Sequence, residues 1–113
     1  MEMKNQVRQE GICMIQSTVP PARSADLARR LLDKNLVACV SITPVRSLYR
    51  WKGEACDDEE HLLIMKTTES LAPAVIRALK SMHPYEVPEI LVLPVTGCHP
   101  PYLDWVSQET RGA

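Results

Sequence analysis

Residues 81–95, SMHPYEVPEILVLPV, constrain the fold most, because this stretch must end a helix, turn sharply and continue as a strand. Pro84 and Pro88 each disfavour helical geometry in the residue before them. We therefore expect a helix that ends near Met82 and a stiff turn after it. Residues 90–93 are all apolar and partly β-branched, which predicts a central strand covered on both faces.

The turn itself concentrates polar side chains, namely His83, Tyr85, Glu86 and Glu89. A rigid backbone holds such side chains in fixed positions, as a binding site requires. The turn is therefore the first place to look for function.

The rest of the chain alternates strands and helices. Residues 11–18 predict a first strand, and residues 22–35 repeat apolar positions at helical spacing. Residues 36–52 predict a long strand, with a bulge or bend at Pro44, which cannot donate to a sheet ladder. The acidic residues 55–60 are expected at the solvated end of a hairpin, before a return strand over residues 60–68.

A second helix precedes the turn, and a last short helix is expected after Pro101. The order strand, helix, strand, strand, helix, strand is that of the α+β, ferredoxin-like split βαβ arrangement, with a C-terminal helix added. We predict one domain over residues 11–110 and a flexible N-terminus over residues 1–10. Because the strands at 62–65 and 90–93 are apolar on both sides, a second covering layer is needed, and another subunit is its simplest source.

Composition excludes several classes of function. The chain has 113 residues and a formal net charge of −1, with no basic cluster that would indicate nucleic acid as a partner. No apolar run approaches the length of a membrane-spanning helix. The first ten residues are polar and carry no apolar signal region, which favours a cytoplasmic location.

The cysteines and the remaining motifs indicate neither a disulfide framework nor an enzyme. The four cysteines, Cys13, Cys39, Cys56 and Cys98, form no C-x-x-C pair, so a structural zinc site of the usual spacing is not expected. The sequence also lacks a glycine-rich phosphate loop and a recognisable Ser/His/Asp or Cys/His arrangement. We therefore predict a protein that is not an enzyme.

Five segments together resemble the CutA family, the divalent-cation tolerance proteins. They are HPYEVPE with its following strand and residues 36–40, 47–53, 65–68 and 102–105, and they span about residues 12–106. The resemblance implies a response to metal ions. It also implies a cytoplasmic homotrimer in which sheets pack together and long hairpins pair across subunits.

Copper or another divalent cation is the cofactor that the resemblance suggests. In the family, copper binding is linked to a Cys at the end of the first strand and to a His-His pair before the proline. Here Gln16 or Ser17 stands at the Cys position and Met82 at the first His, so His83 alone carries over. His83 is thus the candidate metal ligand.

The resemblance also implies an intersubunit cleft, bordered by Tyr49, Trp51, Lys66, Tyr85, Glu89 and Trp105. Lys66 lies in a strand that should be central, and it needs a carboxylate partner there. We expect Glu89 or a carboxylate of another subunit in that role. The cleft could bind a small ligand, or its charges could serve to lock the interface.

Three functions follow as expectations. The first is divalent-cation tolerance with possible copper binding. The second is a regulatory trimer that binds a small metabolite or anion in the cleft, as the PII signalling proteins of similar fold do. The third is a stable scaffold for a partner protein, which should show an exposed apolar patch.

Overall fold

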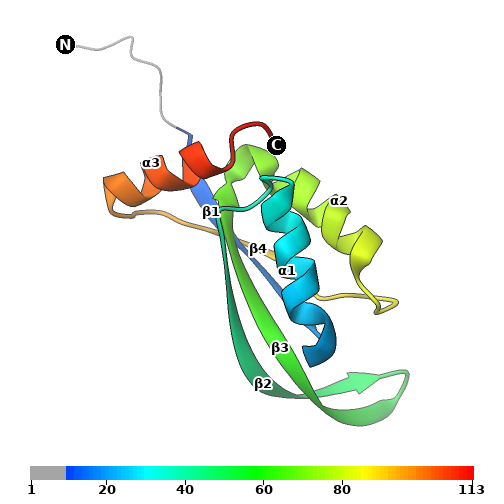
Figure 1. Cartoon of the computed structure of the whole chain (residues 1–113). Helices are drawn as coiled ribbons and strands as arrows, with labels where there is room; N and C mark the ends of the chain where they lie inside the picture. The colour runs from blue at the N-terminus through cyan, green and yellow to red at the C-terminus, as the bar shows by residue number, and fades with distance from the viewer. Residues whose placement is uncertain (1–9) are drawn as a thin grey trace, which may run out of the picture.

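The computed structural model describes residues 10–113, and Figure 1 shows a twisted sheet with two helices packed on one side. The predicted flexible N-terminus lies outside the described residues except for Glu10. The elements follow the predicted order: β1 (Ile12–Val19), α1 (Ser24–Asp33), β2 (Cys39–Trp51), β3 (Glu54–Thr68), α2 (Ala72–Met82), β4 (Leu91–Pro94) and α3 (Pro100–Glu109). The four antiparallel strands stand in the order β2-β3-β1-β4, which confirms the ferredoxin-like α+β fold.

Helices α1 and α2 cover one face of the sheet because each carries an apolar stripe at helical spacing. The stripes consist of Leu27, Ala28 and Leu31 in α1, and of Ala72, Val75 and Leu79 in α2. They pack on Ile15, Leu63 and Met65, which are fully buried. Helix α2 ends at Met82, as the proline after His83 predicts.

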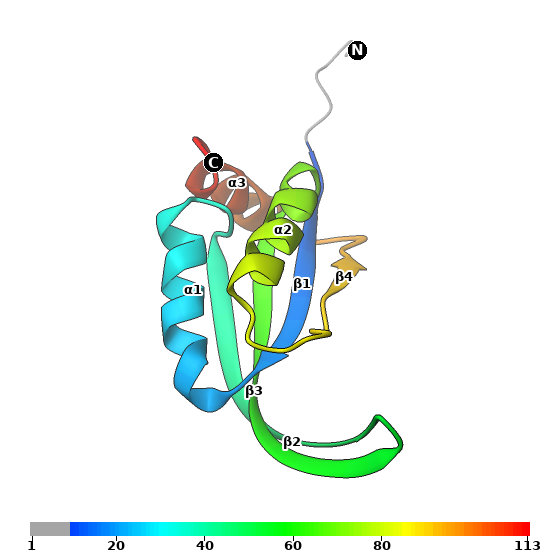
Figure 2. The same cartoon turned by 90° about the vertical axis from the view of Figure 1, so that its right-hand side faces the viewer.

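Among the described residues, the opposite face of the sheet is open over most of its length, and on that side only α3 contacts β1 and β3, at one end (Figures 1 and 2). Because side chains alternate along a strand, the neighbours of the core residues point to this face. The register pairs Met14 with Lys66 and Gln16 with Ile64 there, and Leu62 continues the row on β3. These five residues are half-buried, and we call this side the uncovered face.

Strands β2 and β3 form a hairpin that projects and bends far beyond the rest of the sheet (Figures 1 and 2). Its turn, Lys52 and Gly53, has positive φ angles of 50° and 81°, the backbone that a two-residue hairpin turn favours. The pairing runs one to one from Cys39↔Lys66 to Trp51↔Glu54, so of the bulge or bend predicted at Pro44 the bulge is absent. An edge strand such as β2 tolerates proline without one.

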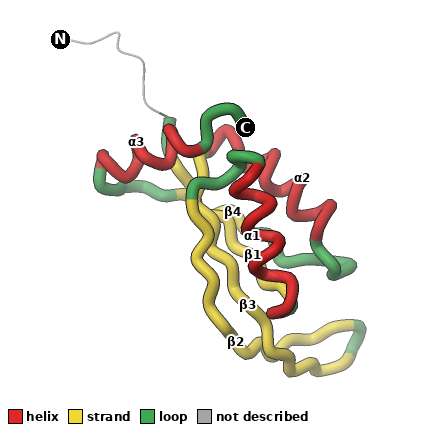
Figure 3. The backbone as a smooth tube through the Cα atoms, viewed as in Figure 1, coloured by secondary structure: helices red, strands yellow, loops and turns green. Residues whose placement is uncertain are grey.

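Two further predictions are corrected by the fold. The acidic run is not a loop: β3 begins at Glu54, and residues 55–60 pair with β2 almost to the tip, as Figure 3 shows. Strand β4 is not central either, because it pairs with β1 alone at the edge of the sheet. Its Leu91 is 50% exposed, so the apolar character of residues 90–93 does not arise from burial within one subunit.

Candidate functional site

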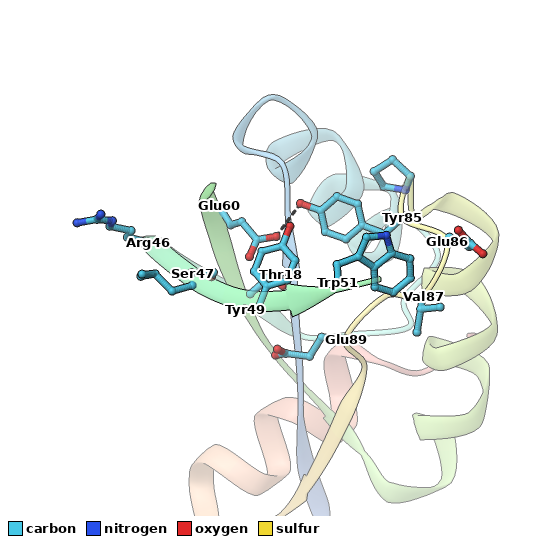
Figure 4. A pocket seen from close by; sticks show the side chains of 12 residues that line it. Thr18, Arg46, Ser47, Tyr49, Trp51, Glu60, Tyr85, Glu86, Val87 and Glu89 are labelled. Atoms are coloured by element: carbon cyan, nitrogen blue, oxygen red, sulfur yellow. Dashed lines mark hydrogen bonds between the residues drawn. The ribbon is translucent and has the colours of Figure 1, made fainter. Parts of the chain in front are cut away.

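A groove of about 750 Å³ lies where the outer half of β2 faces the proline-rich turn. Figure 4 shows its side chains, which come from the end of β1, from both hairpin strands and from the turn. We call it the hairpin groove. It is lined by Thr18, Arg46, Ser47, Leu48, Tyr49, Trp51, Glu60, Pro84, Tyr85, Glu86, Val87 and Glu89.

The hairpin strands are tied to the turn by a bond between Tyr85 and Glu60. The Tyr85 hydroxyl donates to Glu60 Oε2 at 2.6 Å, and Glu60 is 5% exposed. Burial and this bond to a carboxylate raise the pKa of Tyr85 well above its ordinary value. On the hairpin itself, the Tyr49 hydroxyl donates to Asp58, and that bond raises the pKa of Tyr49.

Both ring nitrogens of His83 are engaged: one anchors the turn to the end of β1, and the other bonds within the turn. Its Nε2 lies 2.9 Å from the Thr18 carbonyl oxygen, and its Nδ1 accepts the Tyr85 backbone N–H at 3.2 Å. These contacts fit one tautomer, in which Nε2–H donates to Thr18. Burial lowers the pKa of His83, which favours the neutral ring that this arrangement uses.

The candidate metal ligand is therefore already bonded to the protein's own backbone. Over residues 10–113 the structure brings together no group of three His, Cys, Asp or Glu side chains that could hold a metal ion. A metal at His83 would have to replace one of its two hydrogen bonds, so the predicted role of His83 in metal binding stays a prediction.

Two cations border the hairpin groove, and both are paired. Arg46 forms a bidentate ion pair with Asp57, with N–O distances of 2.9 and 2.7 Å. Lys52 Nζ lies 3.6 Å from Glu86 Oε1 and 5.6 Å from the centre of the Trp51 ring. Both side-chain pairs are exposed, and such pairs contribute little to stability.

Four of the six predicted cleft residues meet in the hairpin groove: Tyr49, Trp51, Tyr85 and Glu89. Lys66 does not join them. Its ammonium donates to Ser41 Oγ at 2.7 Å and lies 3.8 Å from Cys39 Sγ. Glu89 instead accepts a bond of 3.0 Å from Gln16 Nε2, so the expected Lys66–Glu89 pair is wrong within one subunit.

Trp105 also lies apart from the groove. It sits on α3 and stacks on Tyr102 with ring centres 5.6 Å apart. Figure 1 places α3 at the opposite end of the sheet from the bent part of the hairpin. Within one subunit, the predicted cleft therefore divides into a hairpin part and a separate aromatic pair on α3.

The fold brings together one Ser/His contact that the sequence does not signal. Ser24 Oγ lies 2.7 Å from His61 Nδ1, and it also donates to the Pro21 carbonyl at 3.0 Å. Because the hydroxyl hydrogen is used by Pro21, Nδ1–H must donate to Ser24, the reverse of what activating a serine nucleophile requires. Ser24 is 3% exposed, and we assign the contact to the start of α1.

Sequence reasoning missed Glu60, Thr18 and Arg46 as groove residues. Glu60 belongs to the acidic run that was expected to be solvated. The burial of Glu60 depends on Tyr85, which lies 25 residues later in the sequence. Had the predicted strand begun at Glu54, the alternation of side chains between the two faces of a strand would have placed Glu60 and Glu59 on opposite sides.

The chain is thus a small α+β protein of the ferredoxin-like class, with one largely open sheet face and a groove between a long hairpin and a proline-rich turn. No helix among the described residues has the length and apolar character needed to cross a membrane. The sequence model of the CutA1 divalent ion tolerance proteins matches residues 13–109. The chain therefore belongs to the CutA family, as its motifs indicate.

Individual relatives agree. The Divalent-cation tolerance protein CutA of Thermus thermophilus is 43% identical over 95 residues, covering 82% of this chain and 92% of that protein. Protein CutA of mouse is 46% identical over 87 residues, covering 76% of this chain. The chain spans about half the length of the mammalian relatives it matches, 49% in mouse.

Solved structures show the same fold. The crystal structure of CutA1 from Oryza sativa superposes with a TM-score of 0.88 at 37% identity, covering 93% of this chain and 98% of that one. A structure described as the PII-like protein CutA from Nostoc, in apo form, gives 0.86 at 34% identity, covering 89% and 99%.

Proposed function

We propose that this divalent-cation tolerance protein works as a homo-oligomer, a trimer, assembled through the uncovered face and the projecting hairpin. The observation that carries the proposal is the uncovered face, where Met14, Leu62 and Ile64 remain half-buried within the part of the subunit that the structure describes. Burying such apolar surface stabilises by about 25 cal/mol per Å². A second copy is the simplest partner with a matching surface.

The shape of the subunit supports assembly. Its radius of gyration is 16.1 Å, against about 13 Å for a compact domain of this length. Its extents of 59 × 25 × 21 Å reflect the projecting hairpin, whose strand β2 is an edge strand of the sheet. Backbone pairing of this edge with another copy would supply the contacts that the projecting part lacks.

The test is the mass in solution by light scattering and sedimentation. We expect three copies for the native protein and dissociation for Ile64→Asp, since a carboxylate at the centre of the uncovered face would be desolvated on assembly. Leu32→Asp, which changes an exposed leucine of α1, is the matched control and should leave the mass unchanged. A native monomer would refute the proposal.

We further propose that a metal ion binds directly to the protein, with His83 as the candidate side chain that coordinates it. Calorimetric titration of Cu(II), Cu(I) and Zn(II) into the native protein and His83→Ala tests it. Saturable binding that the variant loses would place a metal at the turn. Binding that is absent or unchanged would favour an indirect response, consistent with two engaged ring nitrogens.

A second candidate function is a regulatory trimer that binds a small molecule, and the hairpin groove favours it. The volume of about 750 Å³ lies within the usual range for small-molecule sites, about 300–1,000 Å³.

A non-enzymatic role agrees with the direction of the Ser24–His61 contact. A cytoplasmic location agrees with the four free cysteines, and cell fractionation would test it.

A further inference from the structure

We propose that the hairpin groove binds a small organic cation through its ammonium group, held between aromatic rings and carboxylates. This inference rests on the small-molecule function proposed for the same groove and names its ligand class. The rings are those of Tyr49, Trp51 and Tyr85, and the carboxylates are those of Glu60, Glu86 and Glu89.

The aromatic lining is the first observation. Figure 4 shows Tyr49, Trp51 and Tyr85 gathered in one place, two from the hairpin and one from the turn. The π face of an aromatic ring attracts an ammonium group, most strongly for Trp, and several rings around one point are the usual recognition site for alkylated ammonium ligands. Tyr49 and Trp51 are 43% and 39% exposed, so their rings are accessible from the groove.

The charge of the groove is the second observation. Among residues 10–113, neither Glu60 nor Glu89 has a cation within ion-pair distance; their partners are the neutral Tyr85 and Gln16. Arg46 borders the groove, but Asp57 neutralises it and Figure 4 shows its guanidinium directed away from the rings. The lining is thus net negative, and the buried Glu60 gains most from a cation nearby.

The third observation is Lys52, a residue of the protein whose ammonium group already lies beside the groove residues Trp51 and Glu86. Its Nζ lies over the Trp51 ring and beside Glu86. The side chain is 70% exposed and stems from the hairpin turn, so it can swing out into water at small cost. Lys52 does not itself line the groove, but its ammonium lies against two lining side chains, so it shows that a cation fits beside them and it competes with a ligand for their charge and ring face.

Other ligand classes fit less well. An anion would meet three carboxylates and no unpaired arginine or lysine among the groove residues. A bare divalent cation requires several oxygen ligands converging on one point, and the described chain brings no three acidic, Cys or His side chains together in that way. Aromatic faces contribute nothing to such an ion but suit an alkylammonium.

The experiment uses Trp51 as its own reporter. In a Trp105→Phe background Trp51 is the single tryptophan, and its fluorescence is followed while putrescine or tetramethylammonium is added at constant ionic strength. We expect a saturable change, and none with butane-1,4-diol or tert-butanol, which have similar shapes without charge. An equal response to the neutral compounds, or no saturable response into the millimolar range, would overturn the proposal.

Variants locate the charge that binds. Glu60→Gln keeps the acceptor for the Tyr85 hydroxyl and should weaken binding of putrescine by about tenfold. Glu59→Gln, the adjacent carboxylate outside the groove, is the matched control and should change it less than about twofold. Lys52→Met removes the internal competitor and should tighten binding. Equal effects of Glu59→Gln and Glu60→Gln would contradict a specific site, with circular dichroism confirming that each variant is folded.

Light scattering in the same titration separates this proposal from the assembly proposal. A stable oligomer without cation binding would refute the ligand but not the assembly. A monomer that binds putrescine with the expected variant pattern would refute the assembly but support the ligand. If putrescine dissociates the oligomer, a lysine or arginine of another copy occupies the groove, and the small-ligand proposal is wrong.

Discussion

Both faces of the sheet carry apolar side chains, but they differ in how fully those side chains are buried within one subunit. On the helix-covered face, Ile15 and Met65 lie opposite each other and are fully buried. One residue further along, Gln16 and Ile64 are paired on the uncovered face and remain half-buried. The same two strands thus supply a closed core on one side and an unfinished surface on the other.

This difference separates two sources of stability. The covered face is stabilised within the subunit, by helices whose apolar stripes match the strands. The uncovered face can gain comparable burial only through assembly, so its contribution depends on protein concentration. Changes on the covered face should therefore act on folding, and changes on the uncovered face should act first on the number of copies.

The largest expected effect comes from adjacent leucines of β3. Leu63→Ala leaves a cavity among fully buried side chains and should lower the free energy of unfolding by about 2–5 kcal/mol. Leu62→Ala, on the uncovered face, should cost much less in the separated subunit and instead weaken self-association. Urea unfolding and sedimentation at matched concentrations measure both. Equal losses of folding stability would abolish the distinction between the faces.

The next effect concerns His83, which fastens the turn where the chain passes from the covered side to edge strand β4. His83→Ala leaves the half-buried Thr18 carbonyl and the Tyr85 N–H without their partner and should cost about 1–3 kcal/mol at pH 8. His99→Gln, an exposed histidine before α3, is the control. A His83→Ala protein as stable as the native one would show that the turn is held by other contacts.

The pH dependence of stability provides a separate check on His83. Burial lowers the pKa of His83 below its ordinary value of 6.5, so the folded state binds fewer protons than the unfolded state. The stability contributed by neutral His83 is complete above pH 6.5 and is lost as the pH falls through the lowered pKa. Unfolding measured from pH 8 to pH 5 should show a steeper loss for the native protein than for His83→Gln; parallel curves would contradict this.

A smaller effect, of opposite sign, is expected at Ser17 on the covered face. Its hydroxyl is completely buried and has no hydrogen-bond partner among the described residues. Ser17→Ala removes that unpaired group and should raise stability by about 1 kcal/mol. A lower midpoint of thermal unfolding would mean that the hydroxyl is satisfied in solution.

The smallest effect is expected for Lys66, the polar counterpart on the uncovered face. Its ammonium is already bonded to Ser41, so Lys66→Met should change the stability of the subunit by less than about 0.5 kcal/mol. Sedimentation then decides whether a carboxylate of another copy pairs with Lys66. Unchanged association would exclude that partner, and weaker association would establish it.

Much of the fold could be predicted from local sequence. The prolines after Met82 and the apolar stripes of both helices act within a few residues, so the order of elements and the end of α2 follow from them. The predicted central position of residues 90–93 was wrong because strand order is not encoded locally. Of the bulge or bend predicted at Pro44, the bulge is absent, since β2 is an edge strand that tolerates proline. Apolar strands indicate burial but not whether the same chain supplies it.

For the candidate site too, some features follow from local sequence and others depend on the tertiary structure. The sequence by itself determined the rigid turn that carries His83 and Tyr85, and the aromatic residues of the hairpin. Only the tertiary structure decided that Glu60 is buried beside Tyr85, that His83 is bonded through both ring nitrogens, and that Lys66 lies away from Glu89. The physical reason is that these contacts join strands and a turn that are distant in sequence, and their partners are set by register and by the bend of the hairpin.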